Sequence, residues 1–112
     1  MERTTITGDL DMNEQVTTRW LIGRDIEACA ELSYRHAELS WLADDFRDAV
    51  RNLHCIGYVA IDAHGRIRGV AVIELCDGNT AKVLHIASDC RAASLALSGR
   101  IASRDSRRTI IV

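Results

Sequence analysis

The hydrophobic pattern divides the chain into short β-prone runs, separated by turn residues and by segments with helical spacing. β-branched and other apolar residues dominate Thr17–Ile22, Cys55–Asp62 and Ile67–Cys76. Runs of this length and composition, bounded by turn formers, are typical of strands. Ala81–Ala87 and Arg107–Val112 have the same character, so the pattern predicts five strands.

Three segments instead repeat their apolar residues with the spacing of a helix. Asp25 is expected to cap the first, whose inward face is Ile26, Cys29, Ala30, Ser33 and Ala37. Ser40 is expected to open the second, whose apolar stripe is Leu42, Phe46, Ala49, Val50 and Leu53. The third is predicted from about Cys90 to Ser103, with Leu97 and Ile101 one turn apart.

Turn residues and length complete the outline of one domain. His64-Gly65 supplies the positive-φ position of a hairpin, and Asp77-Gly78-Asn79 is a second turn. Residues 1–15 are polar and aperiodic and are predicted to be a mobile leader. Residues 16–112 are then one domain, because a chain of 112 residues has material for a single core.

Composition narrows the setting of the protein. Hydrophobic residues make up 47% and charged residues 27%, as in ordinary globular domains. No apolar run is long enough to span a bilayer, and the N-terminus lacks the apolar region of a signal peptide. The four cysteines are scattered without a C-x-x-C pair. These features predict a cytoplasmic protein with free thiols.

Charge and other chemistry give weaker leads. Residues 1–77 carry fourteen acids and eight arginines, whereas residues 78–112 carry two acids and six basic residues. A basic C-terminal part could receive a polyanion or could simply be a solvated helix face. Nucleic-acid binding is not favoured, since only five aromatic residues are scattered along the chain. His54, Cys55, His85 and Cys90 lack the spacing of a metal site, so no metal is predicted.

The order β-α-α-β-β-β-α-β, together with four local stretches, resembles the GNAT superfamily of N-acetyltransferases. The similarity is greatest to its ribosomal-protein alanine acetyltransferase type. The four stretches are Arg24-Asp25-Ile26, Trp41 with Asp44-Asp45-Phe46, Asn52–Ala60, and Gly69–Leu75. The resemblance implies an α+β fold with a mixed sheet. It also implies that this chain, which ends after the fifth strand, lacks the last two strands of the family.

The resemblance further implies an acetyl-CoA site at the end of the fourth strand and the start of the last helix. In the family the strand offers main-chain groups to the pantetheine arm, here over Leu84–Ser88. The pyrophosphate sits on amides of a (Q/R)-x-x-G-x-(G/A) turn, matched here by Arg91-x-x-Ser94-x-Ala96, with Ser94 in place of glycine. Asp89 places an acid beside that turn. The candidate cofactor-binding residues are Leu84, Ile86, Ser88, Arg91, Ala92, Ala93, Ser94, Leu95 and Ala96.

The catalytic groups of the resembled enzymes have no counterpart at the expected places. Those enzymes take a base from a glutamate in the fifth strand and an acid from a tyrosine just beyond it. Here that strand reads Thr109-Ile110-Ile111-Val112, without a carboxylate. No catalytic residue is therefore assigned, and the substitutes open to consideration are Glu38, Tyr58, Glu74 and His85.

The sequence thus predicts an acetyl-CoA-dependent N-acetyltransferase domain acting weakly or incompletely on an amine. The alternative is a non-catalytic binding or dimerisation module of the same fold. A homodimer is expected on two grounds. The strand at Thr109–Val112 presents an uncharged edge. Apolar surface is also expected around Leu97 and Ile101, where the family's last strands would lie.

Overall fold

The computed structural model describes residues 15–104 and 109–111. Within them the elements follow in the predicted order, with one short 3-10 turn added. The strands are β1 (Thr17–Trp20), β2 (Cys55–Ile61), β3 (Ile67–Cys76), β4 (Thr80–Ser88) and β5 (Thr109–Ile111). The helical elements are η1 (Gly23–Asp25), α2 (Ile26–His36), α3 (Ala43–Arg51) and α4 (Arg91–Arg104). The leader predicted for residues 1–15 falls, except for Gln15, outside the described residues.

The five strands form one mixed sheet in the order β1-β2-β3-β4-β5. Strands β1 to β4 are antiparallel to one another in sequence order, and β5 runs parallel to β4. The two hairpin turns use the left-handed backbone that glycine tolerates best, since Gly65 has φ 82° and Gly78 has φ 73°. Both turns lie where the sequence predicts them.

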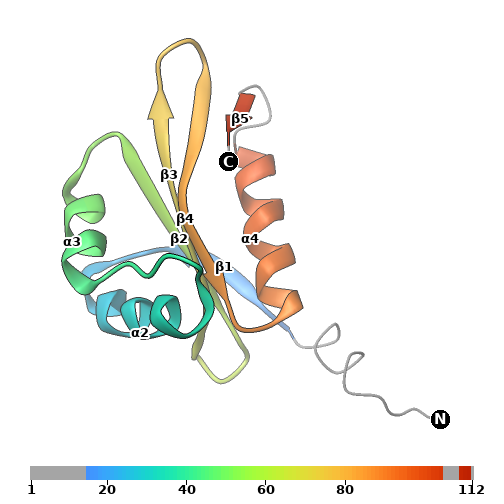
Figure 1. Cartoon of the computed structure of the whole chain (residues 1–112). Coiled ribbons are helices and arrows are strands. Elements are labelled where there is room, and N and C mark those ends of the chain that lie inside the picture. The colour runs from blue at the N-terminus through green and yellow to red at the C-terminus, as the bar shows by residue number, and fades with distance from the viewer. Residues whose placement is uncertain (1–14, 105–108, 112) are drawn as a thin grey trace.

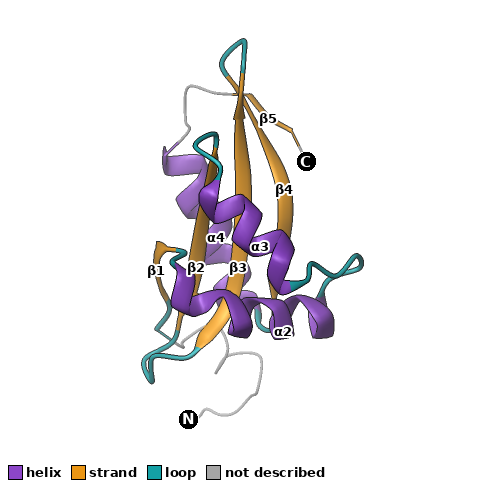
Figure 2. Cartoon of the chain, turned by 90° about the vertical axis from the view of Figure 1, so that its left-hand side faces the viewer, coloured by secondary structure: helices purple, strands orange, loops and turns teal. Residues whose placement is uncertain are grey.

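Helices cover both faces of the sheet, and the sheet separates the hydrophobic core into two layers (Figures 1 and 2). α2 and α3 cover one face over a core that includes Cys29, Phe46 and Val70. α4 covers the other face. Its side chains Ala93, Leu97 and Ile101 join a core made with Tyr58, Ala60, Ala71 and Ile73. Each central strand is therefore buried on both sides, which explains its nearly continuous apolar sequence.

The two helices on the first face begin differently from the prediction. The carboxylate of Asp25 makes no cap bond to α2; it accepts from the Ile22 amide (3.0 Å) and pairs with Arg19 (2.7 and 2.9 Å). The second helix opens at Ala43 rather than at Ser40. The carboxylate of Asp45 accepts from the Leu42 amide at 2.8 Å, which satisfies a backbone donor at the start of α3.

The predicted apolar stripe of α3 is only partly correct. Phe46 and Ala49 are buried, but Leu42, Val50 and Leu53 are exposed, Leu53 to 96%. α3 ends at Arg51, so Leu53 lies beyond the helix in the turn before β2. A short helix at the margin of a sheet buries one narrow face, and the spacing alone does not show where that face ends.

The apolar surface expected around Leu97 and Ile101 is absent among the described residues. Leu97 is fully buried and Ile101 is 6% exposed, because both pack onto β2 and β3. Of the predicted strand Arg107–Val112, the described part is β5, which pairs through Thr109, Ile110 and Ile111 with the start of β4. Its three residues are exposed.

Candidate functional site

The C-terminal half of β4 presents a free edge. β5 pairs with β4 only at Thr80, Ala81 and Lys82. From Val83 to Ser88 no strand of the described chain pairs with that side of β4, while β3 pairs with the other side. The backbone groups along such an edge are available to a ligand that can hydrogen-bond like a strand. The predicted cofactor-binding residues Leu84, Ile86 and Ser88 lie on this segment.

A β-bulge interrupts the pairing of β3 and β4 at the start of the free edge. Val72 lies opposite His85, whereas Ile73 lies opposite Val83, so Leu84 is an extra residue on β4. A bulge leaves one residue unpaired and redirects the side chains around it. Because of the bulge, the face of the sheet on which the His85 side chain lies cannot be read from regular alternation along β4.

A pocket of about 300 Å³ adjoins this edge. Its walls come from β4 and from the connection between α2 and α3. They are formed by Ala37, Glu38, Leu39, Val83, Leu84, His85 and Ile86. The lining is apolar except for two ionisable side chains, an exposed glutamate and a buried histidine. This open pocket is at the lower end of the size range of small-molecule sites.

His85 is held on three sides beneath this pocket. Its Nε2 lies 2.8 Å from Ser33 Oγ, and the same hydroxyl accepts from the Trp41 amide at 2.7 Å. The indole of Trp41 stacks on the imidazole, with ring centroids 4.8 Å apart and an interplanar angle of 11°. Phe46 meets the imidazole edge-on at 5.6 Å. The imidazole is therefore fixed in position and orientation.

Burial sets the charge state of this imidazole. The residue is 7% exposed, and desolvation lowers the pKa of His85 below its ordinary value of 6.5. The carboxylate of Asp45 acts in the opposite direction but does not outweigh burial. His85 is consequently neutral at pH 7 and able to accept a proton.

The beginning of α4 lies directly after the free edge and carries the other predicted cofactor-binding residues. The amide of Ser94 donates to the Cys90 carbonyl at 3.2 Å and is thus already engaged in the helix. A backbone hydrogen bond from Ala93 reaches the Cys90 side chain. Amides earlier in the first turn, at Arg91 and Ala92, have no partner within a helix. Leu95 and Ala96 lie in the second turn of α4.

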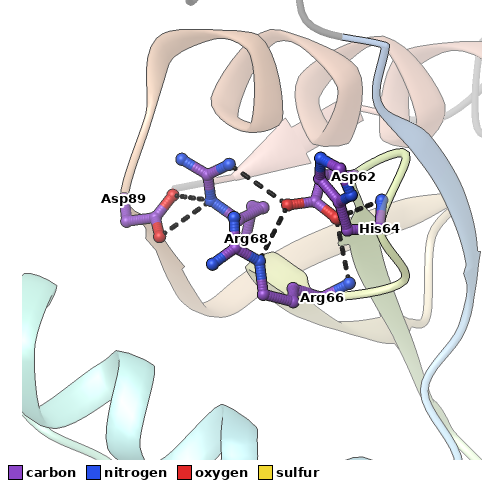
Figure 3. Close-up of polar contacts among 5 residues, drawn as sticks. All are labelled: Asp62, His64, Arg66, Arg68 and Asp89. Atoms are coloured by element: carbon purple, nitrogen blue, oxygen red, sulfur yellow. Dashed lines mark hydrogen bonds and ion pairs between the residues drawn. The ribbon is translucent and has the colours of Figure 1, made fainter.

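Asp89, next to this helix start, is neutralised by Arg68 (Figure 3). Arg68 Nε donates to both carboxylate oxygens of Asp89, at 2.8 and 3.0 Å, and the Asp89 amide donates to the Arg68 carbonyl. The acid is thus paired rather than directed as a free charge at an anion. Charge alone therefore does not exclude a phosphate from this turn.

Arg68 is anchored in turn by Asp62, whose side chain is fully buried in the turn between β2 and β3 (Figure 3). Burial acts to raise the pKa of Asp62. Hydrogen bonds from the Arg66 and His64 amides and from the Arg68 guanidinium outweigh it and lower that pKa to about 2. The β2–β3 hairpin and the β4–α4 turn are therefore joined by one ionic network.

The structure separates the four candidate substitutes for the missing catalytic groups. Tyr58 lies in the core beneath α4, and its buried hydroxyl has no hydrogen-bond partner in the described part of the chain. Glu74 lies opposite Lys82, outside the pocket lining. Glu38 and His85 both line the pocket. Of the four, these two are placed to act on a ligand beside β4.

Sequence reasoning missed the partners of His85. The helical spacing predicts Ser33 as an ordinary member of the first helix's inward face, and Trp41 enters only as part of a family motif. One signal was present, because a serine in an apolar helical stripe must find a hydrogen-bond partner when it is buried. Nothing in the sequence shows that this partner is a histidine 52 residues away.

Other site types are not supported by the described residues. They contain no group of three or more His, Cys, Asp and Glu side chains placed to hold a metal. The cysteines of this part are free, and burial raises the pKa of Cys29 to about 12, which removes it as a thiolate nucleophile. No helix of the described chain is long and apolar enough to cross a membrane.

Comparison with solved structures identifies the fold. The ribosomal-protein alanine N-acetyltransferase from Escherichia coli matches 83% of this chain with a TM-score of 0.69 and 14% identity. The corresponding enzyme from Brucella melitensis biovar Abortus matches 87% with a TM-score of 0.65 and 20% identity. An aminoglycoside 6'-N-acetyltransferase from Acinetobacter baumannii matches 87% with a TM-score of 0.66 and 8% identity.

The chain spans 61% of the length of the E. coli enzyme and 78% of each of the other two. No protein-family model matches the sequence, and no curated protein matches it significantly. The structural likenesses confirm the predicted fold class. The described chain has the mixed α+β fold of GNAT N-acetyltransferases, with a five-stranded sheet.

Proposed function

We propose that this protein binds acetyl-CoA along the free edge of β4 and transfers its acetyl group to an amine in the adjoining pocket. The observation that carries the proposal is the edge Val83–Ser88, which no described strand covers and which borders the 300 Å³ pocket. The GNAT fold supports the same assignment, since the structural neighbours named above are N-acetyltransferases. A second substrate must reach the same pocket for transfer to occur.

The residues present fit an extended pantetheine arm and a diphosphate. Val83–Ser88 would hold the arm through the backbone of β4, as an added strand is held. The first amides of α4, at Arg91 and Ala92, would receive the diphosphate, helped by the positive end of the helix dipole. The pairing of Asp89 with Arg68 weakens the repulsion that the Asp89 carboxylate would otherwise exert on the diphosphate. The coenzyme would supply an activated acetyl thioester.

The second candidate is a non-catalytic module with the same fold. Two observations favour it: the described fifth strand, Thr109–Ile111, has no carboxylate, and Ser94 occupies the place of a glycine in the phosphate turn. Such a module would bind coenzyme or a protein partner without releasing thiol. The cytoplasmic location and the homodimer expected from the sequence stay predictions under either reading.

Calorimetric titration with acetyl-CoA tests the binding step. We expect saturable one-site binding. Amide chemical-shift changes should be concentrated in residues 84–96, and thiol should be released when a panel of amines is added. Binding without thiol release would favour the non-catalytic module. Shifts mapped mainly outside residues 84–96 would remove the proposed site.

The Ser94→Gly variant tests the phosphate end of the site. We expect it to bind acetyl-CoA several-fold more tightly, because the serine side chain crowds the turn where the backbone must approach phosphate. Ser98→Gly in the exposed part of α4 is the matched control and should leave affinity unchanged. Acetyl-pantetheine, which lacks the diphosphate, should bind both variants equally. A gain that also appears with acetyl-pantetheine would contradict the placement of the diphosphate.

A further inference from the structure

We propose that His85 is the general base of this site and accepts a proton at Nδ1 from the acceptor amine. The inference rests on the proposed acetyl transfer and names the residue that would serve it. His85 lies on β4, whereas the base of the resembled enzymes is a glutamate on the fifth strand. The role of His85 is thus inferred from the contacts of this chain and is not carried over from those enzymes.

Position is the first argument. His85 is one of the residues that line the pocket beside the free edge of β4, and we place the acceptor nitrogen in that pocket, within reach of the His85 ring. Of the other ionisable candidates, Tyr58 is sealed beneath α4 and Glu74 lies outside the lining. Glu38 shares the pocket but is exposed on the connection between α2 and α3. Its carboxylate can attract an ammonium group without being fixed toward the reacting atom.

The two ring nitrogens are differently engaged, which defines the direction of proton transfer. Nε2 is tied to Ser33 Oγ at 2.8 Å. Nδ1 has no hydrogen-bond partner among the described residues and is not one of their fully buried, unpaired atoms. The proposed role includes the tautomer with the proton on Nε2 and Ser33 Oγ accepting from it. The other tautomer, in which the Ser33 hydroxyl donates to Nε2 and the proton sits on Nδ1, is the result that the NMR experiment below would count against it. With the proton on Nε2, the lone pair of Nδ1 is available to the pocket.

The surroundings of the ring support both states of a base. At rest, burial favours the neutral imidazole. When Nδ1 takes a proton, the resulting cation lies against the face of Trp41, stacked at 4.8 Å, and near the carboxylate of Asp45. The Nε2–H bond to Ser33 strengthens as the ring becomes charged. The site thus favours the neutral base at rest, while Trp41, Asp45 and Ser33 partly offset the desolvation of its conjugate acid.

The groups facing His85 from each neighbouring element can be named. β3 contributes Val72, α2 contributes Ser33, α3 contributes Phe46 and the charge of Asp45, and the connection between the helices contributes Trp41 and Glu38. Both ionisable neighbours are acids, and of the two the carboxylate of Asp45 favours a positive imidazole. Desolvation opposes it and sets the net direction.

The protons balance as follows. An ammonium acceptor begins with three protons, and the amide product keeps one on nitrogen. A new carbon–nitrogen bond replaces the carbon–sulfur bond, and the electron pair of that bond leaves with sulfur. Of the two protons that nitrogen loses, one passes to Nδ1 of His85 and then to solvent, and the other ends on the coenzyme thiol. No oxidant or metal is required.

NMR of the unliganded protein tests the assignment without reference to activity. The His85 imidazole should show the Nε2–H tautomer and a titration midpoint below 6.5. The peaks are assigned by their loss in His85→Gln, and exposed His36, His54 and His64 provide internal references. Ser33→Ala should shift the His85 tautomer balance but not the reference residues. An Nδ1–H tautomer, or a His85 midpoint at or above 6.5, would overturn the proposal.

Kinetics give the second test. His85→Gln should lower kcat/KM for the amine by at least about 100-fold, the usual range for a lost general base, and leave the calorimetric Kd of acetyl-CoA within about twofold. The exposed His54→Gln variant is the matched control and should keep full activity. In the wild type, kcat/KM should rise with pH through the midpoint measured for His85 by NMR, a readout that stands even if His85→Gln folds poorly.

The outcomes separate the two proposals. Full activity in His85→Gln would overturn the role of His85 and leave acetyl transfer standing. If the wild type neither binds acetyl-CoA nor releases thiol, the proposed function is overturned. The role of His85 as the base of that reaction would then be overturned as well, even if the NMR result matched the expectation.

Discussion

At the scale of single residues, the aromatic layer beneath the pocket combines stability with a chemically useful side chain. Phe46 is fully buried and makes edge contacts with Trp41 at 5.2 Å and with His85 at 5.6 Å. The residue that closes the core below α3 therefore also supports the imidazole. A change at Phe46 should affect both folding and the site.

Phe46→Ala should lower the free energy of unfolding by about 3–5 kcal/mol, the range for deleting a buried aromatic side chain. Denaturant unfolding measures the loss. Leu53→Ala, at a side chain 96% exposed, is the control and should change stability by less than about 0.5 kcal/mol. A loss below about 1 kcal/mol for Phe46→Ala would show that α3 is not packed through this ring.

The carboxylate of Asp62 gives a prediction in pH. Its pKa is about 2 in the folded protein against an ordinary value of 3.8, so folding favours the charged form. This contribution is fully present above the unfolded value and is lost as the pH falls toward 2. Wild type should thus exceed Asp62→Asn in stability by a constant margin above about pH 5. The margin should shrink between about pH 4 and 2, as followed by unfolding curves at each pH. A margin that stays constant to pH 2 would contradict the hydrogen-bonded, charged state.

At the scale of elements, the contact between α4 and the sheet depends on a missing side chain. A Cβ at Gly69 would lie 2.9 Å from Leu97 Cδ1, 3.2 Å from Ala93 Cβ and 3.3 Å from Ser88 Cβ. Glycine on β3 thus allows α4 to lie close, and the same contact places the start of α4 beside the end of β4. The geometry of the candidate site depends on this approach.

Gly69→Ala should destabilise the protein by about 1–3 kcal/mol through overpacking. It should also shift the amide signals of the first turn of α4, because the added methyl group presses on Ala93. Gly99→Ala is a control that should change the stability in the opposite direction. Gly99 has open space around it within α4, so alanine there should stabilise by up to about 1 kcal/mol. Thermal unfolding of the two variants should move in opposite directions; a rise in Tm for Gly69→Ala would refute the close packing.

At the scale of the whole molecule, the outer edge of β5 is a surface at which a second copy of the chain could pair. Ile110 and Ile111 of β5 are 36% and 46% exposed, and no described strand pairs with the outer side of β5. The second ground for a dimer, apolar surface on α4, is removed because Leu97 and Ile101 are buried. The expectation of a dimer therefore rests on the sheet edge alone.

We expect a homodimer about a two-fold axis at micromolar concentration, measured by sedimentation velocity, because uncharged edge strands tend to pair. Replacing Ile110 and Ile111 together by lysine should give a monomer with an unchanged circular dichroism spectrum. Lysine in place of the exposed Ser103 of α4 is the control and should leave association intact. A wild-type monomer under these conditions would show that the edge is protected.

The sequence by itself determined the order of the elements and the two hairpin turns. These features are encoded locally, since strand and helix periodicities and positive-φ glycines such as Gly65 act over a few residues. The order together with four local stretches was enough to predict a GNAT-like fold, which the structural comparisons confirm. Cap positions and the buried part of the α3 stripe were less well defined, because Leu42 and Val50 satisfy the helical spacing without being covered.

Only the tertiary structure decided which residues meet. The pairing of His85 with Ser33 joins positions 52 residues apart, and the bond from Arg68 to Asp89 joins positions 21 apart. Neither contact has a periodic signal, because both depend on the strand register and on the bulge at Leu84. The burial of Leu97 likewise depends on how closely α4 approaches Gly69. Local sequence specifies the elements, but the side chains of the site are selected by packing between elements distant in the chain.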